Sequence, residues 1–476
     1  MVADDGIEGG ETVRLQQVSD GGNPSPLPAK DDAENDYDPH LHRDLSNPTN
    51  NMETLVHLLK CSLGTGILAM PQAFHRSGLV TGIIGTILIG ILITHCLHVL
   101  IRAQYATCKH QRVPLLSYTA SVSAALAMGP PTVRKWTRCM SLCVDVFLVV
   151  YQLGICCVYI VFIADNIKKI VDPYYVMAVE VHMLIILGPL IAFNLIPSLK
   201  ILAPFSALAN VLTLIGIAII IYFLLSGKKS EEPLDLWGSY VNYPLFFGTT
   251  LFALTAVGVV VAVENNMKTP KAFGKPCGVL NTAMTIIVAL YISVGAIGYV
   301  FCTSTCSDSI TLDLPKDSPL AVTVIVMMAV AIFISYGLQC YVPVEVLWNN
   351  YLLPRLEDAS PKRKRIWEYG LRIVLCLLTF ILAVSVPRLG LFISLFGALC
   401  LSALGICFPV MMDVFTIYTK PDSARKRFIY IKSIILFFIG LIGLVAGTYT
   451  ALRSIILSFQ PQAVAAIANA TVEVPE

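Results

Sequence analysis

Apolar runs separated by short polar segments dominate the chain from about residue 50 to residue 457. Each run is long enough for a helix to cross the roughly 30 Å of bilayer hydrocarbon, which takes about 20 residues. Continuous runs such as residues 211–225 lack the alternation of a barrel strand, so the pattern predicts helices. Charged residues, proline and glycine mark the ends of eleven predicted spans. These spans lie near residues 52–75, 79–104, 137–166, 177–195, 200–226, 243–265, 278–303, 319–347, 369–387, 390–418 and 430–457.

Composition places the chain among membrane proteins, because 56% of its 476 residues are hydrophobic and only 13% are charged. We therefore expect an all-α integral membrane protein that has the lipid bilayer as a partner. Residues 1–49 differ, with eleven acidic residues, three basic residues and no long apolar run, which predicts a disordered acidic tail. The predicted domains are this tail, an eleven-helix bundle at 50–458 and a short tail at 459–476.

The distribution of basic residues predicts the orientation in the membrane. One set of alternate loops holds 21 Lys and Arg residues, and the other set with the C-terminal end holds 8. Because basic residues favour the cytoplasmic side, we expect a cytoplasmic N-terminus and, with an odd number of spans, an extracytoplasmic C-terminus. The sequon at Asn469 lies in that C-terminal tail and is a candidate glycosylation site.

The first predicted span is interrupted by small and polar residues at Ser62, Gly64, Thr65 and Gly66. Glycine weakens a helix by about 1 kcal/mol relative to alanine and permits unwound backbone. Within a membrane, unwound backbone persists where protein or a watery cavity satisfies its polar groups. Close packing of helices through small residues is the alternative explanation of this motif.

A second interruption lies in the sixth predicted span, at Thr255, Ala256 and Gly258. Spans one and six are equivalent members of a five-plus-five inverted repeat. Broken helices at equivalent positions indicate a substrate site at the membrane midplane, where the ends of half-helices meet a carboxylate or a cation. The two breaks together favour a transporter over other classes of membrane protein.

Several short motifs follow one another in the chain, namely Leu55-Val56-His57-Leu58-Leu59-Lys60, Gly64-Thr65-Gly66-Ile67-Leu68, Asp145-Val146-Phe147-Leu148, Tyr151-Gln152-Leu153-Gly154, Tyr243-Pro244-Leu245-Phe246-Phe247-Gly248-Thr249, Glu264-Asn265-Asn266-Met267-Lys268, Tyr341-Val342-Pro343-Val344-Glu345 and Pro387-Arg388-Leu389. In this order they resemble the motifs of the proton-coupled amino acid transporters of the amino acid/auxin permease superfamily, and the resemblance covers about residues 50–457.

The resemblance implies a LeuT-like five-plus-five inverted repeat with an additional eleventh helix. It also implies symport of protons with small neutral amino acids, and its proton-site histidine matches His57. Imidazole titrates near pH 6.5, which suits proton loading and release, although a neutral hydrogen-bonded histidine is the alternative. The family's span-six break usually reads Phe-Glu-Gly-Ile-Gly, whereas Thr255 and its neighbours lack the acidic residue, so the pocket wall differs here.

Four further ionisable residues fall at or near predicted spans, namely Lys60, Asp145, Glu264 and Glu345. Charges in a membrane cost about 2.5–3.5 kcal/mol each on insertion scales, so each needs a structural or functional reason. They are either structurally paired inside the bundle or part of a polar relay with His57.

Other chemistry finds little support in the sequence. His95 and His98 share the second span without a third ligand, and most of the fourteen cysteines fall in apolar runs, so we predict no metal and no cofactor. Cys302 and Cys306 are candidates for a local disulfide, because the loops lack the cysteines of the family's external bridge.

We predict neither an enzyme nor a nucleic-acid partner. A sodium-coupled transporter and an amino-acid sensor with little flux remain alternatives. We expect the plasma membrane as the location, with an endosomal or lysosomal membrane as the alternative.

Overall fold

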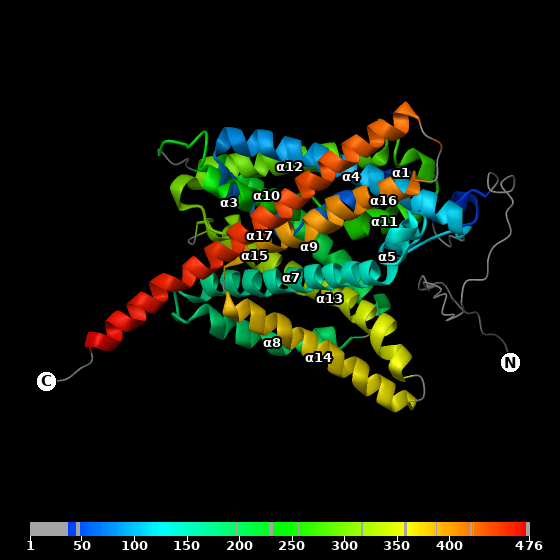
Figure 1. Ribbon diagram of the computed structural model, residues 1–476. Helices are drawn as coiled ribbons and strands as arrows, with labels where there is room; N and C mark the ends of the chain where they lie inside the picture. Colours follow the sequence, from blue (N-terminus) through cyan, green and yellow to red (C-terminus); the bar gives the residue numbers. More distant parts are fainter. Residues whose placement is uncertain are drawn as a thin grey trace, which may run out of the picture.

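The computed structural model describes residues 37–43, 48–196, 199–227, 232–255, 257–315, 318–356, 359–386, 388–418, 421 and 423–472. Within these ranges the regular elements are helices, and one isolated parallel bridge joins Thr49 to Met267. The helices lie side by side in one bundle, with the first described residues and the end of the last helix at opposite ends (Figure 1). That arrangement fits an odd number of crossings.

Eight helical segments in the described ranges are long and apolar enough to cross a membrane, and α8 is a shorter apolar helix. The shorter helix α8 spans Val179–Asn194. The eight long segments are α4 (Leu79–Gln111), α7 (Thr137–Val171), α9 (Leu199–Ser226), α12 (Val279–Cys302), α13 (Pro319–Leu347), α14 (Pro361–Ser385), the continuous run of α15 (Leu389–Phe396) with η8 (Gly397–Cys407) and α16 (Phe408–Thr416), and α17 (Ala424–Val472).

The two remaining predicted spans are interrupted helices. Span one comprises α1 (Asn51–Ser62), α2 (Thr65–Leu68) and α3 (Met70–Ser77), and span six comprises α10 (Tyr243–Leu254) and α11 (Val257–Asn265). Every predicted span therefore has a helical counterpart. The connecting elements are η1 (Pro39–Leu41), α5 (Tyr118–Ala127), α6 (Pro131–Arg134), η2 (Tyr240–Asn242), η3 (Pro270–Ala272), η4 (Thr303–Thr305), η5 (Ile310–Leu312), η6 (Trp348–Leu352) and η7 (Leu353–Leu356).

Local sequence explains several boundaries of these helices. The Asn50 side chain accepts from the Glu53 backbone N–H, and the Glu53 carboxylate accepts from the Asn50 N–H, so a capping box starts α1. Gly78 separates α3 from α4 with φ of 81°, a conformation that disfavours other residues. A Cβ there would also lie 2.4 Å from the Gly238 backbone nitrogen, so both constraints select glycine.

The bundle has a buried centre and a lipid-exposed rim. In the tenth span, 83% of the most apolar stretch is buried, against 11% in α17. α17 crosses the other helices diagonally and extends beyond them (Figure 1). It packs on spans six and ten through glycines, and a Cβ at Gly443 would lie 2.2 Å from the Phe247 ring. Small residues permit such close contact between membrane helices.

The structure differs from the sequence expectations at both chain ends. α17 continues to Val472, past the expected boundary at residue 458, and so includes Asn469. Part of the expected disordered tail, residues 37–43 and 48–49, packs against the bundle. Cys302 and Cys306 form the local disulfide. Ala256 lies outside the described residues.

Candidate functional site

The predicted break in span one is present in the structure. α1 ends at Ser62, and Leu63 is extended with φ and ψ of −82° and 104°. Gly64 is also extended, and a Cβ built on it would meet nothing within 4 Å. The helix resumes at Thr65, whose side chain is buried. Unwound backbone therefore lies beside open space in the middle of this span.

The predicted break in span six is present as well. α10 ends at Leu254, and Thr255 is extended with φ and ψ of −100° and 114°. The Thr255 side chain is 4% exposed, and its hydroxyl oxygen has no hydrogen-bond partner within the described part of the chain. Gly258 follows in α11. A buried hydroxyl without a partner is costly, so this atom is available to a polar ligand.

The two breaks lie against one another. A Cβ on Gly66 would approach the Ala253 Cα within 2.8 Å and the Ala253 Cβ within 3.2 Å. Gly66 therefore permits the backbones of α2 and α10 to touch. Tyr291 of α12, which is fully buried, donates a hydrogen bond from its hydroxyl to the Ser62 carbonyl. This bond satisfies one of the carbonyls left free where α1 ends.

The ionisable residues of the predicted relay do not converge. His57 is exposed on α1, and Lys60 and Glu345 are half-buried on α1 and α13. Asp145 is buried and accepts hydrogen bonds from the Thr119 hydroxyl at 2.8 Å and from the Tyr351 hydroxyl at 2.9 Å.

Glu264 is occupied by a different partner. It forms a buried ion pair with Arg43 of the N-terminal tail, with 3.2 Å between the Arg43 Nη2 and the Glu264 Oε2. Among the described residues, no hydrogen bond or ion pair connects His57 to this pair, to Asp145 or to Glu345. The geometry thus supports structural pairing for Asp145 and Glu264.

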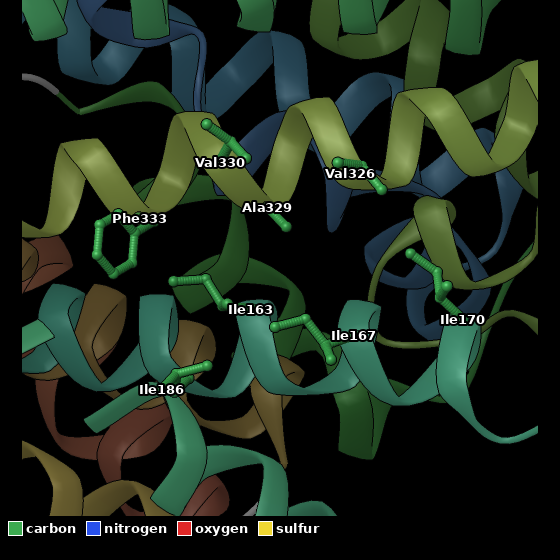
Figure 2. Close-up of a pocket in the computed structure, with 8 residues that line it drawn as sticks. All are labelled: Ile163, Ile167, Ile170, Ile186, Val326, Ala329, Val330 and Phe333. Carbon is green, nitrogen blue, oxygen red and sulfur yellow. The ribbon is translucent and has the colours of Figure 1, made fainter. Parts of the chain in front are cut away.

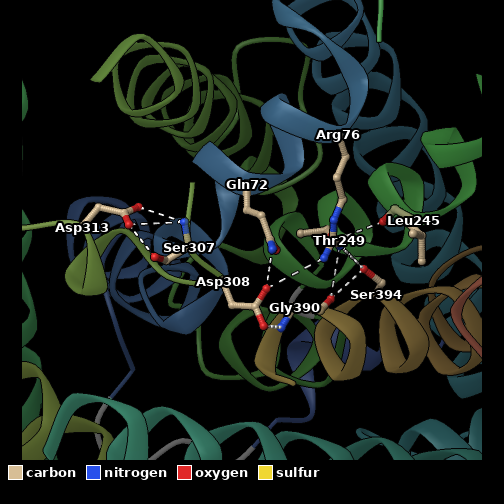
Figure 3. A network of polar contacts seen from close by, with 9 residues as sticks. All are labelled: Gln72, Arg76, Leu245, Thr249, Ser307, Asp308, Asp313, Gly390 and Ser394. Atoms are coloured by element: carbon tan, nitrogen blue, oxygen red, sulfur yellow. Dashed lines mark hydrogen bonds and ion pairs between the residues drawn. The ribbon is translucent and has the colours of Figure 1, made fainter. Parts of the chain in front are cut away.

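A polar network lies at the end of span one that α3 forms, and Figure 3 shows its side chains and contacts. Asp308, in the loop after α12, accepts from the Gln72 side chain and from the Gly390 backbone N–H at 3.0 Å. Asp308 also forms an ion pair with Arg76, with 3.9 Å between the Arg76 Nη2 and the Asp308 Oδ1. Arg76 also donates to the Ser394 hydroxyl at 3.2 Å.

This network links spans one, six and ten through one chain of polar atoms. The Ser394 and Thr249 hydroxyl oxygens are 2.8 Å apart, and Thr249 lies on α10. In the same loop, burial raises the pKa of Asp313 above its ordinary value, although hydrogen bonds from the Ser307 N–H and hydroxyl oppose that shift. Such a network is suited to act as a gate, because its members belong to elements that would have to separate to open this end.

Two cavities lie away from both breaks. One, of about 260 Å³, lies between α7, α8 and α13 and is lined only by apolar side chains (Figure 2), namely Ile163, Ile167, Ile170, Ile186, Val326, Ala329, Val330 and Phe333. A zwitterionic amino acid needs polar partners, which this cavity lacks. The other, of about 560 Å³, lies between α4 and α12 and includes His95, His98 and Asn281.

Metal-binding chemistry is not apparent at either break. Within the described ranges, no group of three or more potential metal ligands comes together. His98 instead pairs with Asn281 through 2.7 Å between the His98 Nε2 and the Asn281 Oδ1. The site at the breaks therefore offers backbone groups and hydroxyls.

An apolar helical bundle in which two interrupted spans meet at their breaks defines a membrane transporter of the LeuT-like fold. The solved inward-facing conformation of Mhp1 has this fold and superimposes with a TM-score of 0.52, covering 89% of this chain and 92% of Mhp1 at 13% identity. The predicted LeuT-like fold is thereby confirmed.

Sequence comparison gives the family. Residues 47–453 match the family described as "Transmembrane amino acid transporter protein". The "Proton-coupled amino acid transporter-like protein pathetic" of Drosophila melanogaster is 36% identical over 441 residues, covering 91% of this chain and 92% of the relative. The "Probable amino acid transporter skat-1" of Caenorhabditis elegans is 25% identical over 426 residues, covering 87% and 92%. The chain belongs to the transmembrane amino acid transporter protein family, and it is not an enzyme.

Sequence reasoning missed several residues that organise the site. Arg76 was only one of the 8 basic residues counted on the less basic side, and no sequence motif singled out Asp308 or Tyr291. Their roles depend on how helices far apart in the sequence face each other. The one available signal was the charge of Arg76 at the end of an apolar span, where an unpaired cation is unfavourable.

Proposed function

We propose that this protein is a proton-coupled symporter of small neutral amino acids that works by alternating access. The observation that carries the proposal is the contact between the two breaks, where a Cβ added to Gly66 would lie 2.8 Å from the Ala253 Cα, and the open space beside Gly64. A zwitterion requires polar groups on both its charged ends, and unwound backbone supplies them inside a membrane. The name of the 36%-identical Drosophila relative supports proton coupling.

In this proposal the substrate lies between the breaks. The backbone and hydroxyl groups of Ser62, Gly64, Thr65 and Gly66 hold its carboxylate, which the positive end of the following half-helix favours. The span-six residues Thr255 and Gly258 are assigned to the opposite wall, and Ala256, which the sequence also indicated, lies outside the described residues. The Thr255 hydroxyl is the natural partner for the substrate ammonium, because it is buried and without a partner in the described part of the chain.

The proton is assigned to His57, on α1 between the start of span one and its break. One proton crossing about 70 mV releases roughly 1.6 kcal/mol, and one pH unit adds about 1.4 kcal/mol. Together, about 3 kcal/mol sustain a gradient of roughly 150-fold for a neutral substrate. That is sufficient for concentrative uptake.

Alternating access requires that the two ends of the path open in turn. The network around Arg76 and Asp308 is the gate at one end, and the region of Arg43 and Glu264 is the gate at the other. The loop charges assign the second end to the cytoplasm. We place the protein in the plasma membrane, with an endosomal or lysosomal membrane as the alternative location and Asn469 as the glycosylation site.

The test is uptake of radiolabelled amino acids by the full-length protein in proteoliposomes with an imposed pH gradient. We expect accumulation of small neutral amino acids when the outside is acidic, and its loss when a protonophore collapses the gradient. Replacing sodium at fixed pH separates the alternatives. Uptake that requires sodium and ignores the pH gradient refutes proton coupling, and specific binding without accumulation identifies a sensor.

A further inference from the structure

The cavity of about 560 Å³ between α4 and α12 opens towards the outside of the bundle. The two helices contact each other at the upper edge of the bundle in Figure 1. Ile91 of α4 is 63% exposed, and Thr285 and Ala289 of α12 are exposed as well. Because α4 and α12 are both long and apolar enough to cross a membrane, this opening faces lipid. The lining residues are Ile87, Gly90, Ile91, Thr94, His95, His98, Asn281, Met284, Thr285, Val288, Ala289 and Ile292.

The cavity follows the antiparallel pairing of the two helices. At one end the His98 Nε2 donates to the Asn281 Oδ1 at 2.7 Å, since an amide oxygen can only accept. Further along, a Cβ on Gly90 would lie 2.5 Å from the Val288 Cγ2, so the helices are in contact at that level. The lining runs over residues 87–98 and 281–292, a rise of about 16 Å along each helix. That length is about half of the roughly 30 Å of bilayer hydrocarbon, which is the depth of one leaflet.

The polar lining residues are gathered at one end of the cavity. Thr94, His95 and His98 lie within about one turn of each other on α4, and Asn281 and Thr285 lie opposite them on α12. The rest of the lining is apolar. Within the described part of the chain, no Lys, Arg, Asp or Glu lines the cavity. A ligand that fits this lining has one polar end, a long apolar body and no charge.

The polar groups have used most of their hydrogen-bond donors inside the protein. The Thr94 hydroxyl donates to the Gly90 carbonyl at 2.7 Å. The Thr285 hydroxyl donates to the Asn281 carbonyl at 2.8 Å, and the Asn281 amide nitrogen donates to two carbonyls of the loop before α12 at 3.3 Å and 2.8 Å. A hydroxyl oxygen that has donated its proton still accepts. The polar end therefore offers acceptors, which a ligand with an O–H donor can use.

A further acceptor is the buried Nε2 of His95, which has no hydrogen-bond partner among the described residues. This nitrogen accepts when the neutral ring carries its proton on Nδ1.

This lining discriminates between the lipids of a membrane. Fatty acids and phospholipids carry a carboxylate or a phosphate, which accepts hydrogen bonds and is best held by a cation that the cavity lacks. A neutral lipid alcohol donates its proton and needs no counter-ion. The volume lies within the roughly 300–1,000 Å³ of sites for one small molecule. It suits a single compact body better than the two acyl chains of a ceramide or a diacylglycerol.

We propose that the groove between α4 and α12 is a binding site for a membrane sterol, whose hydroxyl donates to the Thr285 and Thr94 oxygens while its rings lie along Ile91 and Ala289. In the orientation proposed above, the polar end is on the cytoplasmic side, so the sterol enters from the cytoplasmic leaflet. The bound sterol bridges spans two and seven, and α12 also packs on α1 and α3 of the interrupted first span. The site does not depend on which substrate is transported.

The test is photolabelling of the full-length protein in phospholipid nanodiscs with a cholesterol analogue that carries a diazirine and an alkyne, followed by peptide mapping. We expect labelled peptides from residues 79–111 and 279–302, and we expect unlabelled cholesterol to compete. Cholesteryl methyl ether is the matched ligand control, because it keeps the ring body and lacks the hydroxyl proton. It should compete about fivefold less well, which corresponds to the loss of one hydrogen bond.

Two protein variants test the two ends of the cavity. Ala289→Phe places a ring in the apolar part and should lower labelling at least about tenfold through a direct clash. Thr285→Val removes the acceptor oxygen and should weaken cholesterol competition about fivefold. The matched controls are Ala207→Phe on α9 and Thr323→Val on α13, both at exposed positions outside the cavity. The Thr323 hydroxyl also donates to the carbonyl four residues earlier, at 2.9 Å, so the two Thr→Val changes are equivalent within their helices.

The outcomes separate a site from the surrounding lipid. Similar labelling of all lipid-exposed helices, unchanged in Ala289→Phe, shows that the sterol is only part of the bulk bilayer. Equal competition by cholesterol and its methyl ether shows that the hydroxyl is not recognised, and stronger competition by a diacylglycerol or a fatty acid shows a different occupant. Each of these results overturns the inference. Labelling of α4 and α12 that only the cavity variants reduce supports it.

Discussion

Substitution of Gly66 by alanine tests whether contact between the two breaks is required. The added Cβ would lie 2.8 Å from the Ala253 Cα, whereas carbon atoms ordinarily rest about 3.5–4.0 Å apart. The neighbouring atom belongs to the backbone of α10, so side-chain rotation cannot relieve the overlap. One of the two helices must move by about 0.7 Å or more. Overpacking of this kind costs about 1–3 kcal/mol.

Gly64 provides the matched control, because it lies two residues away and has free space where its Cβ would be. We expect Gly66→Ala to lower the melting temperature of the purified protein and to reduce initial uptake about tenfold, which is the effect of roughly 1.4 kcal/mol on a barrier. Gly64→Ala should melt with the wild type. Equal melting temperatures for both variants and the wild type would refute the packing argument, and so would a loss of stability in Gly64→Ala alone.

Three further predictions concern ionisable residues. His57→Ala should abolish uptake driven by a pH gradient while surface expression, measured by biotinylation, is unchanged; full pH-dependent uptake in this variant contradicts the assignment. Asp308→Asn should lower stability by about 1–3 kcal/mol, because Arg76 loses its charged partner, and thermal unfolding in detergent measures this; an unchanged unfolding temperature contradicts a structural role for the pair. Burial and the nearby Arg43 lower the pKa of His40 from its ordinary 6.5 to about 4, against the opposing charge of Asp38. When residues 37–43 are released from the bundle, the pKa of His40 returns to about 6.5, so the released state binds a proton at a higher pH than the packed state does. Packing of residues 37–43 should therefore weaken as the pH falls from about 6.5 towards 4. Amide protection of these residues, measured by hydrogen–deuterium exchange, should fall in the wild type but not in His40→Phe.

The positions of the spans and of both breaks could be predicted from sequence, because lipid exposure imposes long apolar runs and small polar residues stand out within them. Leu63 and Gly64, within the predicted stretch from Ser62 to Gly66, and Thr255 interrupt the helices where the pattern placed the breaks. The pattern does not reveal how each helix is rotated about its own axis. The rotation of a helix about its axis decides which of its side chains contact the neighbouring helices.

Pairs of residues distant in sequence show this limit most clearly. Arg43 and Glu264 are 221 positions apart, and nothing in the acidic tail marks Arg43 as the residue that becomes buried. Asp145 was considered for a relay with His57, but its partners in the structure are Thr119 and Tyr351. The π-helical turns of η8, from Gly397 to Cys407, also have no signature in hydrophobic periodicity.

The low burial of α17 has a consequence for biosynthesis. Only 11% of its most apolar stretch is buried, and its contacts with the bundle are made on one side, against spans six and ten. Domains generally form in the order in which they are synthesised. The core can therefore assemble around the breaks while α17 is still being translated, and the last helix then docks on a surface that is already complete.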